Sequence, residues 1–164
     1  MRNIILIGMP GVGKSTVGVV LAKTLGIGFI DTDLIIQQTK GKLLNEIIAE
    51  DGLEGFLKIE EEAILSKEYR GMVVATGGSA VFSSKAMEHL RNDGVIVYLN
   101  APYEVIEKRL KNIKSRGVVA KEGQTILDIY HQRVPYYETY CDINIECENS
   151  SVEKTVEKII SKLK

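Results

Sequence analysis

The 164-residue sequence is short of cysteine and of long apolar runs. Two cysteines, Cys141 and Cys147, are too few for a disulfide framework, and no cysteine–histidine pair has the spacing of a zinc site. The longest apolar runs, such as Ile4–Ile7 and Val95–Leu99, fall well below the roughly 20 residues that a membrane span needs. A strand-like run and a glycine-rich loop follow Met1 almost at once, which is unlike a signal peptide. We therefore expect a cytoplasmic protein with no membrane partner.

Neither sign of charge predominates, since 21 basic residues face 22 acidic ones and the net charge is −1. Proteins that bind a nucleic acid duplex normally show a basic excess, so we expect no nucleic acid partner. The one crowded basic stretch is Lys108–Arg116. A short basic cluster in a neutral protein favours a small anionic ligand.

What the sequence does contain is typical of one folded α/β domain over residues 1–164, with 45% hydrophobic and 26% charged residues. Strands are expected at Ile4–Ile7, Gly28–Asp31, Met72–Thr76, Val95–Leu99 and Asp142–Ile145. Helices are expected over Lys14–Leu25, over Leu34–Tyr69 with breaks at Gly41 and Asp51–Gly52, from Ser83 or Ser84 to Leu90, from near Pro102 to Asn112, and over Thr125–Gln132 and Val152–Leu163. The strands lack polar alternation, which is typical of parallel strands buried on both faces. Strands that alternate with helices then predict a doubly wound, three-layer α/β fold.

The segment Gly8–Ser15 fits the pattern G-x-x-x-x-G-K-[ST] at every fixed position. Its glycines let successive backbone N–H groups point into one hollow at a helix N-terminus, where they can hold phosphate oxygens. Lys14 would reach the β- and γ-phosphates, and the Ser15 hydroxyl would ligate Mg²⁺. The residues expected to hold the nucleotide are Gly11, Val12, Gly13, Lys14, Ser15 and Thr16.

A phosphate loop alone is shared by kinases, GTPases and motor ATPases. The tetrapeptide Asn-Lys-x-Asp, which GTPases use to read guanine, does not occur here. A motor ATPase would need a longer chain. A small domain with one phosphate loop has the layout of a small-molecule kinase that uses ATP and Mg²⁺.

Further motifs, in matching order and spacing, resemble the shikimate kinase family from Ile4 to the C-terminal helix. They are Asp31-Thr32-Asp33, Phe56 with Glu60, Thr76-Gly77-Gly78-Ser79, Arg116, and Arg133-x-Pro135-x-Tyr137. The resemblance implies a five-stranded parallel sheet in the order 2-3-1-4-5. It also implies acceptor-binding helices at about 33–61 and a lid at about 112–124. We expect the protein to be a monomer.

Two carboxylates follow the second expected strand, at the edge where open α/β sheets bind their ligands. Asp31 could hold Mg²⁺ through water beside Ser15. The resemblance makes Asp33 the hydrogen-bond acceptor for the hydroxyl that receives the phosphoryl group, and a candidate general base. Either aspartate could instead cap the helix that starts near Leu34, and Asp33 is the better placed of the two for that role.

Three arginines and two glycines complete the candidate site. Arg116 would close a lid over the phosphates and offset charge in the transition state. By resemblance, Arg109 stacks on adenine and Arg133 grips the substrate carboxylate in a planar fork. Gly77 and Gly78 would let the acceptor approach the backbone where a Cβ would block it. The alternatives are a solvated helix-end arginine for Arg109, a surface ion pair for Arg133 and a plain turn for the glycines.

The sequence departs from the family at two positions near the expected acceptor. The third glycine of the family's turn is Ser79 here, and the Phe-Arg-x-x-Glu motif reads Phe56-Leu57-Lys58-Ile59-Glu60. The missing arginine is half of the family's clamp on the shikimate carboxylate, and its loss would cost ~2–4 kcal/mol of binding. Arg133 would then hold shikimate alone with help from Lys58, or the acceptor is another small hydroxylated acid such as homoserine.

The leading hypothesis is phosphoryl transfer from ATP, with Mg²⁺, to a hydroxyl of shikimate in aromatic amino acid biosynthesis. Lys14, Asp33 and Arg116 are the expected catalytic residues. The alternatives are a kinase of homoserine or another small hydroxylated acid, and a nucleotide-binding module that has lost catalysis. A nucleoside monophosphate kinase is disfavoured, because Arg116 and Arg133 leave few arginines for a second phosphate group.

Overall fold

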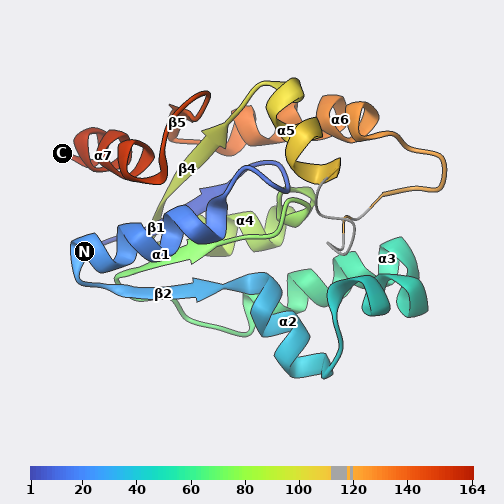
Figure 1. The fold of residues 1–164 in the computed structure, drawn as a ribbon. Helices are drawn as coiled ribbons and strands as arrows, with labels where there is room; N and C mark the ends of the chain where they lie inside the picture. Colours follow the sequence, from blue (N-terminus) through green and yellow to red (C-terminus); the bar gives the residue numbers. More distant parts are fainter. Residues whose placement is uncertain (112–117, 119) are drawn as a thin grey trace.

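Five strands form one parallel sheet in the computed structural model, which describes residues 1–111, 118 and 120–164 (Figure 1). The strands are β1 (Asn3–Ile7), β2 (Gly28–Asp31), β3 (Met72–Ala75), β4 (Gly94–Asn100) and β5 (Ile143–Glu146). Their order is β2-β3-β1-β4-β5, and every neighbouring pair is parallel. The predicted α/β fold and its strand order are confirmed.

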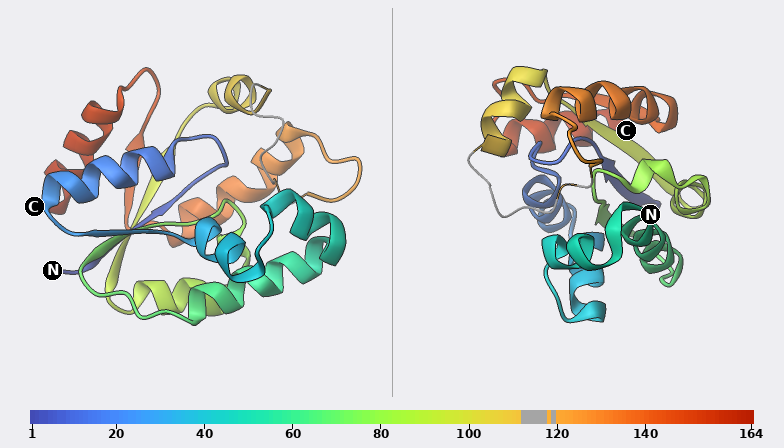
Figure 2. Two further views of the ribbon diagram at one scale, coloured as in Figure 1. Left: turned by 60° about the horizontal axis from the view of Figure 1, so that its bottom comes forward. Right: turned by 90° about the vertical axis from the view of Figure 1, so that its right-hand side faces the viewer.

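Helices cover both faces of the sheet (Figure 2). Crossovers between parallel strands are right-handed, so the face on which a helix lies depends on the direction in which the next strand is added across the sheet. One face carries α1 (Lys14–Leu25) and α7 (Val152–Leu163), which pack together. The other carries α3 (Leu44–Leu65), α4 (Ser84–Arg91) and α6 (Ile126–Tyr140). The remaining described helices are α2 (Thr32–Lys40), α5 (Tyr103–Lys111) and the 3₁₀ turn η1 (Ala80–Phe82). Within the described ranges, no helix is long and apolar enough to span a membrane.

The sheet is stabilised by strands whose side chains are buried on both faces. Ile5, Leu6, Val73, Val74 and Ile96 are all completely buried. Each such side chain contributes roughly 1.5–3 kcal/mol when it leaves water. The apolar runs in the sequence therefore form the centre of the sheet and hold its carboxyl-terminal edge in place.

Most predicted helix boundaries lie within two residues of the observed ones, but α6 was predicted wrongly. The helix was expected to stop at Gln132, whereas it continues through Pro135 to Tyr140. A proline inside a helix removes one backbone donor and usually disfavours the helix. Here Arg133 and Tyr137, four residues apart and so on one face of α6, are both buried against the rest of the molecule. Tertiary packing outweighs the local preference of Pro135.

A second, smaller apolar core lies between α2 and α3. Ile36, Leu44, Ile47 and Phe56 are buried together there. The predicted breaks are present, since Gly41 ends α2 in a left-handed conformation and Gly52 kinks α3 with φ 72°. The kink redirects the second half of α3 so that Phe56 reaches both this core and the carboxyl ends of the strands.

Candidate active site

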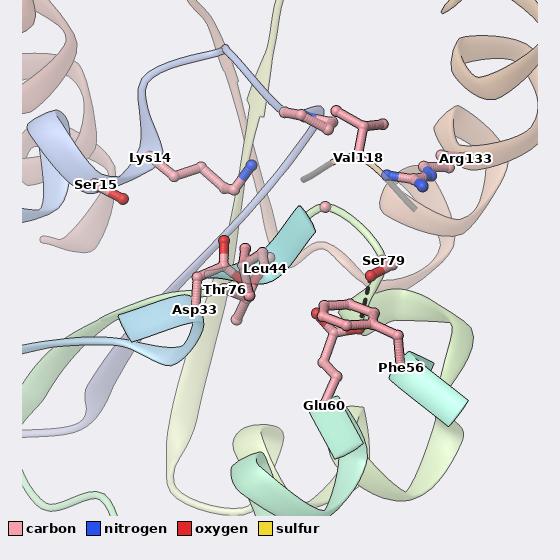
Figure 3. Close-up of a pocket in the computed structure, with 13 residues that line it drawn as sticks. Lys14, Ser15, Asp33, Leu44, Phe56, Glu60, Thr76, Ser79, Val118 and Arg133 are labelled. Atoms are coloured by element: carbon pink, nitrogen blue, oxygen red, sulfur yellow. Dashed lines mark hydrogen bonds between the residues drawn. The ribbon is translucent and has the colours of Figure 1, made fainter. Parts of the chain in front are cut away.

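A pocket lies at the carboxyl ends of β1 and β3, where an open parallel sheet is expected to bind its ligand (Figure 3). The pocket opens to solvent, and charged, polar and apolar residues line it. Segments far apart in the sequence line it together. The predicted site residues among them are Lys14, Ser15, Asp33, Gly77, Gly78 and Arg133.

The phosphate loop between β1 and α1 has the backbone that its glycines predict. Gly8, Gly11 and Gly13 all have positive φ, and a Cβ on Gly8 would lie 2.7 Å from the Leu99 carbonyl oxygen. Gly13 is the N-cap of α1 and provides no side-chain hydrogen bond to the first turn. The Nζ of Lys14, a residue only 7% exposed, donates to the carbonyls of Gly8 and Met9 over 2.7 and 2.9 Å. The loop thus presents helix N–H groups and one ammonium, which suits a phosphate group.

Arg109 lies against this loop rather than in solvent at the end of α5. Its Nη1 donates to the carbonyls of Gly11 and Val12 over 3.2 and 2.9 Å. A second cavity, on the other side of the loop, is lined by Arg109 and Thr16 together with Cys147. The predicted nucleotide-binding residues therefore divide between two adjoining spaces, with the loop between them.

Ser15 and Asp31 form the pair that was predicted to hold a metal ion. The Ser15 hydroxyl donates to Oδ2 of Asp31 over 2.5 Å, while Oδ1 accepts from the backbone N–H groups of Asp33 and Leu34. Asp31 is thus the N-cap of α2, and the view that Asp33 is the better placed cap is wrong. Hydroxyl and carboxylate oxygens are ligands that Mg²⁺ accepts, and its remaining positions are commonly filled by water and substrate phosphate.

The predicted lid lies mostly outside the described residues. Arg116 falls there, together with the rest of 112–117 and with residue 119. Val118 is described and lines the pocket beside the phosphate loop and α6 (Figure 3).

Gly77 and Gly78 form a turn with no room for side chains. A Cβ on Gly77 would lie 2.6 Å from both Oδ1 of Asp33 and Oε2 of Glu60. A Cβ on Gly78 would lie 2.7 Å from the Pro10 ring and 2.9 Å from Nη1 of Arg133. The turn therefore brings two carboxyl groups and a guanidinium close to bare backbone, which a plain strand-to-helix turn would not require.

Gly77→Ala is expected to raise the KM for the acceptor about tenfold, because the added methyl group displaces both carboxyl groups. Carboxyl groups are the movable ends of their side chains, so the effect should fall on acceptor binding more than on folding. Gly28→Ala is the matched control, since its Cβ would make only an ordinary 3.6 Å contact with Met72. Steady-state kinetics and thermal denaturation of both variants test the prediction, and an unchanged KM in Gly77→Ala would contradict it.

Arg133 is a buried residue, so its interpretation as a surface ion pair is wrong. It is 1% exposed, and its guanidinium carbon lies 5.5 Å from the centre of the Phe82 ring, within the range of a cation–π interaction. One turn later on α6, Tyr137 stacks on Tyr98 and its hydroxyl donates to the Gly78 carbonyl over 2.6 Å. These contacts fix α6 against the glycine turn and hold the guanidinium at the pocket.

Glu60 is the buried carboxyl group of this pocket, at 2% exposure. The Ser79 hydroxyl donates to its Oε1 over 2.7 Å (Figure 3). Burial is the main reason that the pKa of Glu60 is raised to about 8, and the negative charge of Asp33 raises it further. The hydrogen bond from Ser79 lowers this pKa. Arg133 and Lys14 lower the pKa less strongly.

Leu57, at the position of the family's arginine, lies in a neighbouring cavity between α3, η1 and α4. Lys58 and Glu61 line the same cavity. Glu60 and Ser79 line both this cavity and the pocket. The hydrogen-bonded pair of Glu60 and Ser79 thus forms a wall between the two spaces.

The sequence interpretation missed three residues of this site. Glu60 belongs to a sequence motif that does not by itself place it in the site, and its four-residue spacing from Phe56 is the available signal. In the sequence, Ser79 stands out only as a departure from the family. Tyr137 belongs to the motif Arg133-x-Pro135-x-Tyr137, but nothing in its local sequence indicates a hydrogen bond to Gly78.

The pocket thus has phosphate-loop residues on one side and a buried guanidinium on the other. On this fold, that arrangement defines a kinase of the phosphate-loop class. The family model for shikimate kinase matches residues 10–164. A shikimate kinase from Thermodesulfovibrio yellowstonii is 39% identical, over 98% of this chain and 94% of the relative. The chain therefore belongs to the shikimate kinase family, whose members are phosphotransferases with an alcohol acceptor.

Solved structures give the same result. A shikimate kinase from Acinetobacter baumannii, determined in complex with shikimate, has a TM-score of 0.91 and 31% identity, over 99% of this chain and 93% of the other.

The human protein threonine synthase-like 1 is 34% identical over 99% of this chain, which spans 22% of that longer protein. None of these similarities supports a homoserine kinase or an inactive nucleotide-binding module.

Proposed function

We propose that the protein transfers the γ-phosphoryl group of ATP to a hydroxyl of shikimate. The observation that carries the proposal is one pocket with Lys14 and the phosphate loop on one side and Asp33 and Arg133 on the other. The related structure that contains shikimate supports this choice of acceptor.

In this proposal the chain acts mainly by positioning and by offsetting charge, which is what phosphoryl transfer requires. The loop N–H groups and Lys14 bind the β- and γ-phosphates, and Arg109 orients the nucleotide from the second cavity. Ser15 and Asp31 would hold Mg²⁺, which supplies positive charge at the phosphate oxygens. From the sequence alone, Arg116 would close over the phosphates.

On the acceptor side, Asp33 accepts a hydrogen bond from the hydroxyl that is phosphorylated, and it is the candidate general base. Arg133 binds the carboxylate, and the bare backbone of Gly77 and Gly78 lets the ring approach. The helices at about 33–61 form the acceptor side, and about 112–124 the lid. We further expect a single-domain monomer in a reducing cytoplasm, where Cys141 and Cys147 stay free thiols.

A coupled ADP-release assay with shikimate and homoserine side by side tests the proposal. We expect turnover with shikimate, dependence on Mg²⁺, and only background ADP release with homoserine or without acceptor. Turnover with homoserine and none with shikimate would show that homoserine, not shikimate, is the acceptor. ATP binding with no ADP release on either acceptor would indicate a binding module instead.

Leu57→Arg is expected to lower the KM for shikimate about tenfold, because it restores the second arginine of the family's clamp on the carboxylate. Leu57→Met is the matched control, since it has a similar volume and no charge. Shikimate titrations at saturating ATP measure both variants. An unchanged or higher KM in Leu57→Arg, with normal stability, would argue for an acceptor other than shikimate.

A further inference from the structure

Two carboxyl groups flank the backbone at Gly77. Oδ1 of Asp33 and Oε2 of Glu60 each lie 2.6 Å from the point where a Cβ of Gly77 would stand. The two oxygens are therefore no farther apart than twice that distance. Two carboxylates this close, one of them almost fully buried, disfavour a state in which both are ionised.

The two oxygens of Glu60 are not equivalent. Oε1 accepts the hydrogen bond from Ser79, whereas Oε2 is buried with no hydrogen-bond partner among the described residues. A buried oxygen without a partner costs about 1–3 kcal/mol, and more when it is charged. Since Glu60 lines the pocket, a bound acceptor is the group that can satisfy Oε2.

We propose, building on the function proposed above, that Glu60 binds the acceptor as a protonated carboxyl group. Ser79 fixes its Oε1, and Oε2–H donates to an acceptor hydroxyl beside Gly77. Asp33 accepts a hydrogen bond from a hydroxyl in the same region of the bound substrate. One hydroxyl, or an adjacent pair, is then held between the carboxyl group of Glu60, which donates, and the carboxylate of Asp33, which accepts. The ligand selected is a polyhydroxylated carboxylate.

Burial and neighbouring charge assign the proton to Glu60 rather than to Asp33. Glu60 is 2% exposed and Asp33 is only partly buried. Lys14 on α1 and Arg133 on α6 favour an ionised Glu60, but burial and the charge of Asp33 on α2 outweigh them. On α3 itself, position 57 is apolar, and Glu61 accepts a hydrogen bond from Ser83. The hydrogen bond from Ser79 also favours the ionised form, and burial outweighs it.

A neutral Glu60 also has a consequence for acceptor charge. An ionised Glu60 would compete with the acceptor carboxylate for the field of Arg133. A protonated Glu60 leaves that positive charge to the acceptor. This explains how a single buried arginine can serve where the family motif has two.

The pH dependence of acceptor binding tests the proposal. Because only the protonated form donates, the shikimate KM should be constant from about pH 6 to near the pKa of about 8, then rise about tenfold per pH unit. Glu60→Gln keeps an N–H donor but cannot ionise, so this alkaline rise should disappear. Glu60→Ala should raise the KM at neutral pH more than Glu60→Gln does. The matched control is Glu61→Gln, which should keep the wild-type pH profile.

A binding measurement separates this proposal from the function on which it rests. The Glu60 carboxyl carbon, followed by ¹³C NMR in wild type with Glu60→Gln to assign it, should titrate well above the usual glutamate range. Saturating shikimate should raise its pKa further, since the ligand binds the protonated form. An ordinary Glu60 pKa, a flat wild-type profile or an alkaline rise that persists in Glu60→Gln would each overturn the proposal. No turnover of any acceptor would refute the proposed function, and the NMR titration would still decide the state of Glu60.

Discussion

Lys14→Ala is expected to lower kcat by about 10³-fold at saturating ATP and shikimate. The ammonium is almost fully buried between the loop carbonyls and the pocket, so its charge acts in an environment with little water. In the proposed mechanism, this donor is already in position and offsets negative charge on the transferring phosphoryl oxygens. Loss of one such preorganised group typically costs about 3–4 kcal/mol at the transition state.

The control for this prediction must separate catalysis from folding, because Lys14 also ties Gly8 and Met9 together. Lys23→Ala removes an exposed lysine from the last turn of the same helix and should leave kcat within about twofold of wild type. Thermal denaturation checks that Lys14→Ala still folds. A folded Lys14→Ala protein with nearly normal kcat would refute the assignment of the phosphate loop.

Elements with strong local signals could be predicted from the sequence nearly to the residue. Helix α1 starts at Lys14 because Gly13 takes a left-handed conformation, and it ends at Leu25 because Gly26 does the same. Both signals are written in neighbouring residues. Pro135 is a case in which local signals fail. A proline predicts the end of a helix, but α6 continues through Pro135 to Tyr140 because its buried face packs against the rest of the molecule.

The site could be predicted as a set of motifs but not as a network of contacts. Spacing placed Ser15 and Asp31 in one site, and their side chains do meet. The hydrogen bond from Ser79 to Glu60 joins residues 19 apart, and that from Tyr137 to Gly78 joins residues 59 apart. Such pairings follow from how helices pack on the sheet, and one sequence without its fold does not contain them.

The same limit applies to Leu57. As a motif position it indicated only a lost arginine. In the structure its side chain lines the cavity between α3, η1 and α4, and Glu60 and Ser79 separate that cavity from the pocket that contains Arg133. Of the two departures from the family, Ser79 donates directly to the buried Glu60, and Leu57 lines the same cavity as Glu60. Among the described residues, Arg133 is the arginine that lines the pocket with that carboxyl group.

Arg133→Lys is accordingly expected to raise the shikimate KM about 100-fold, with a smaller effect on kcat and none on the KM for ATP. Lysine keeps the positive charge but offers a point charge in place of the planar fork that grips a carboxylate in two hydrogen bonds. It also loses the stacked contact of the guanidinium with the Phe82 ring. Because Arg133 is 1% exposed, Arg133→Ala would leave a cavity in the packed interior, so lysine is the more informative change.

Arg70→Lys provides the matched control, since Arg70 is exposed and pairs only with exposed Glu68 among the described residues. Exposed ion pairs of this kind contribute little, so its kinetics and melting temperature should stay at wild-type values. Initial rates over a matrix of shikimate and ATP concentrations separate the two KM values in each variant. Equal increases in both KM values for Arg133→Lys would place Arg133 outside the acceptor subsite, because a carboxylate ligand on α6 has no reason to weaken ATP binding on the far side of Lys14.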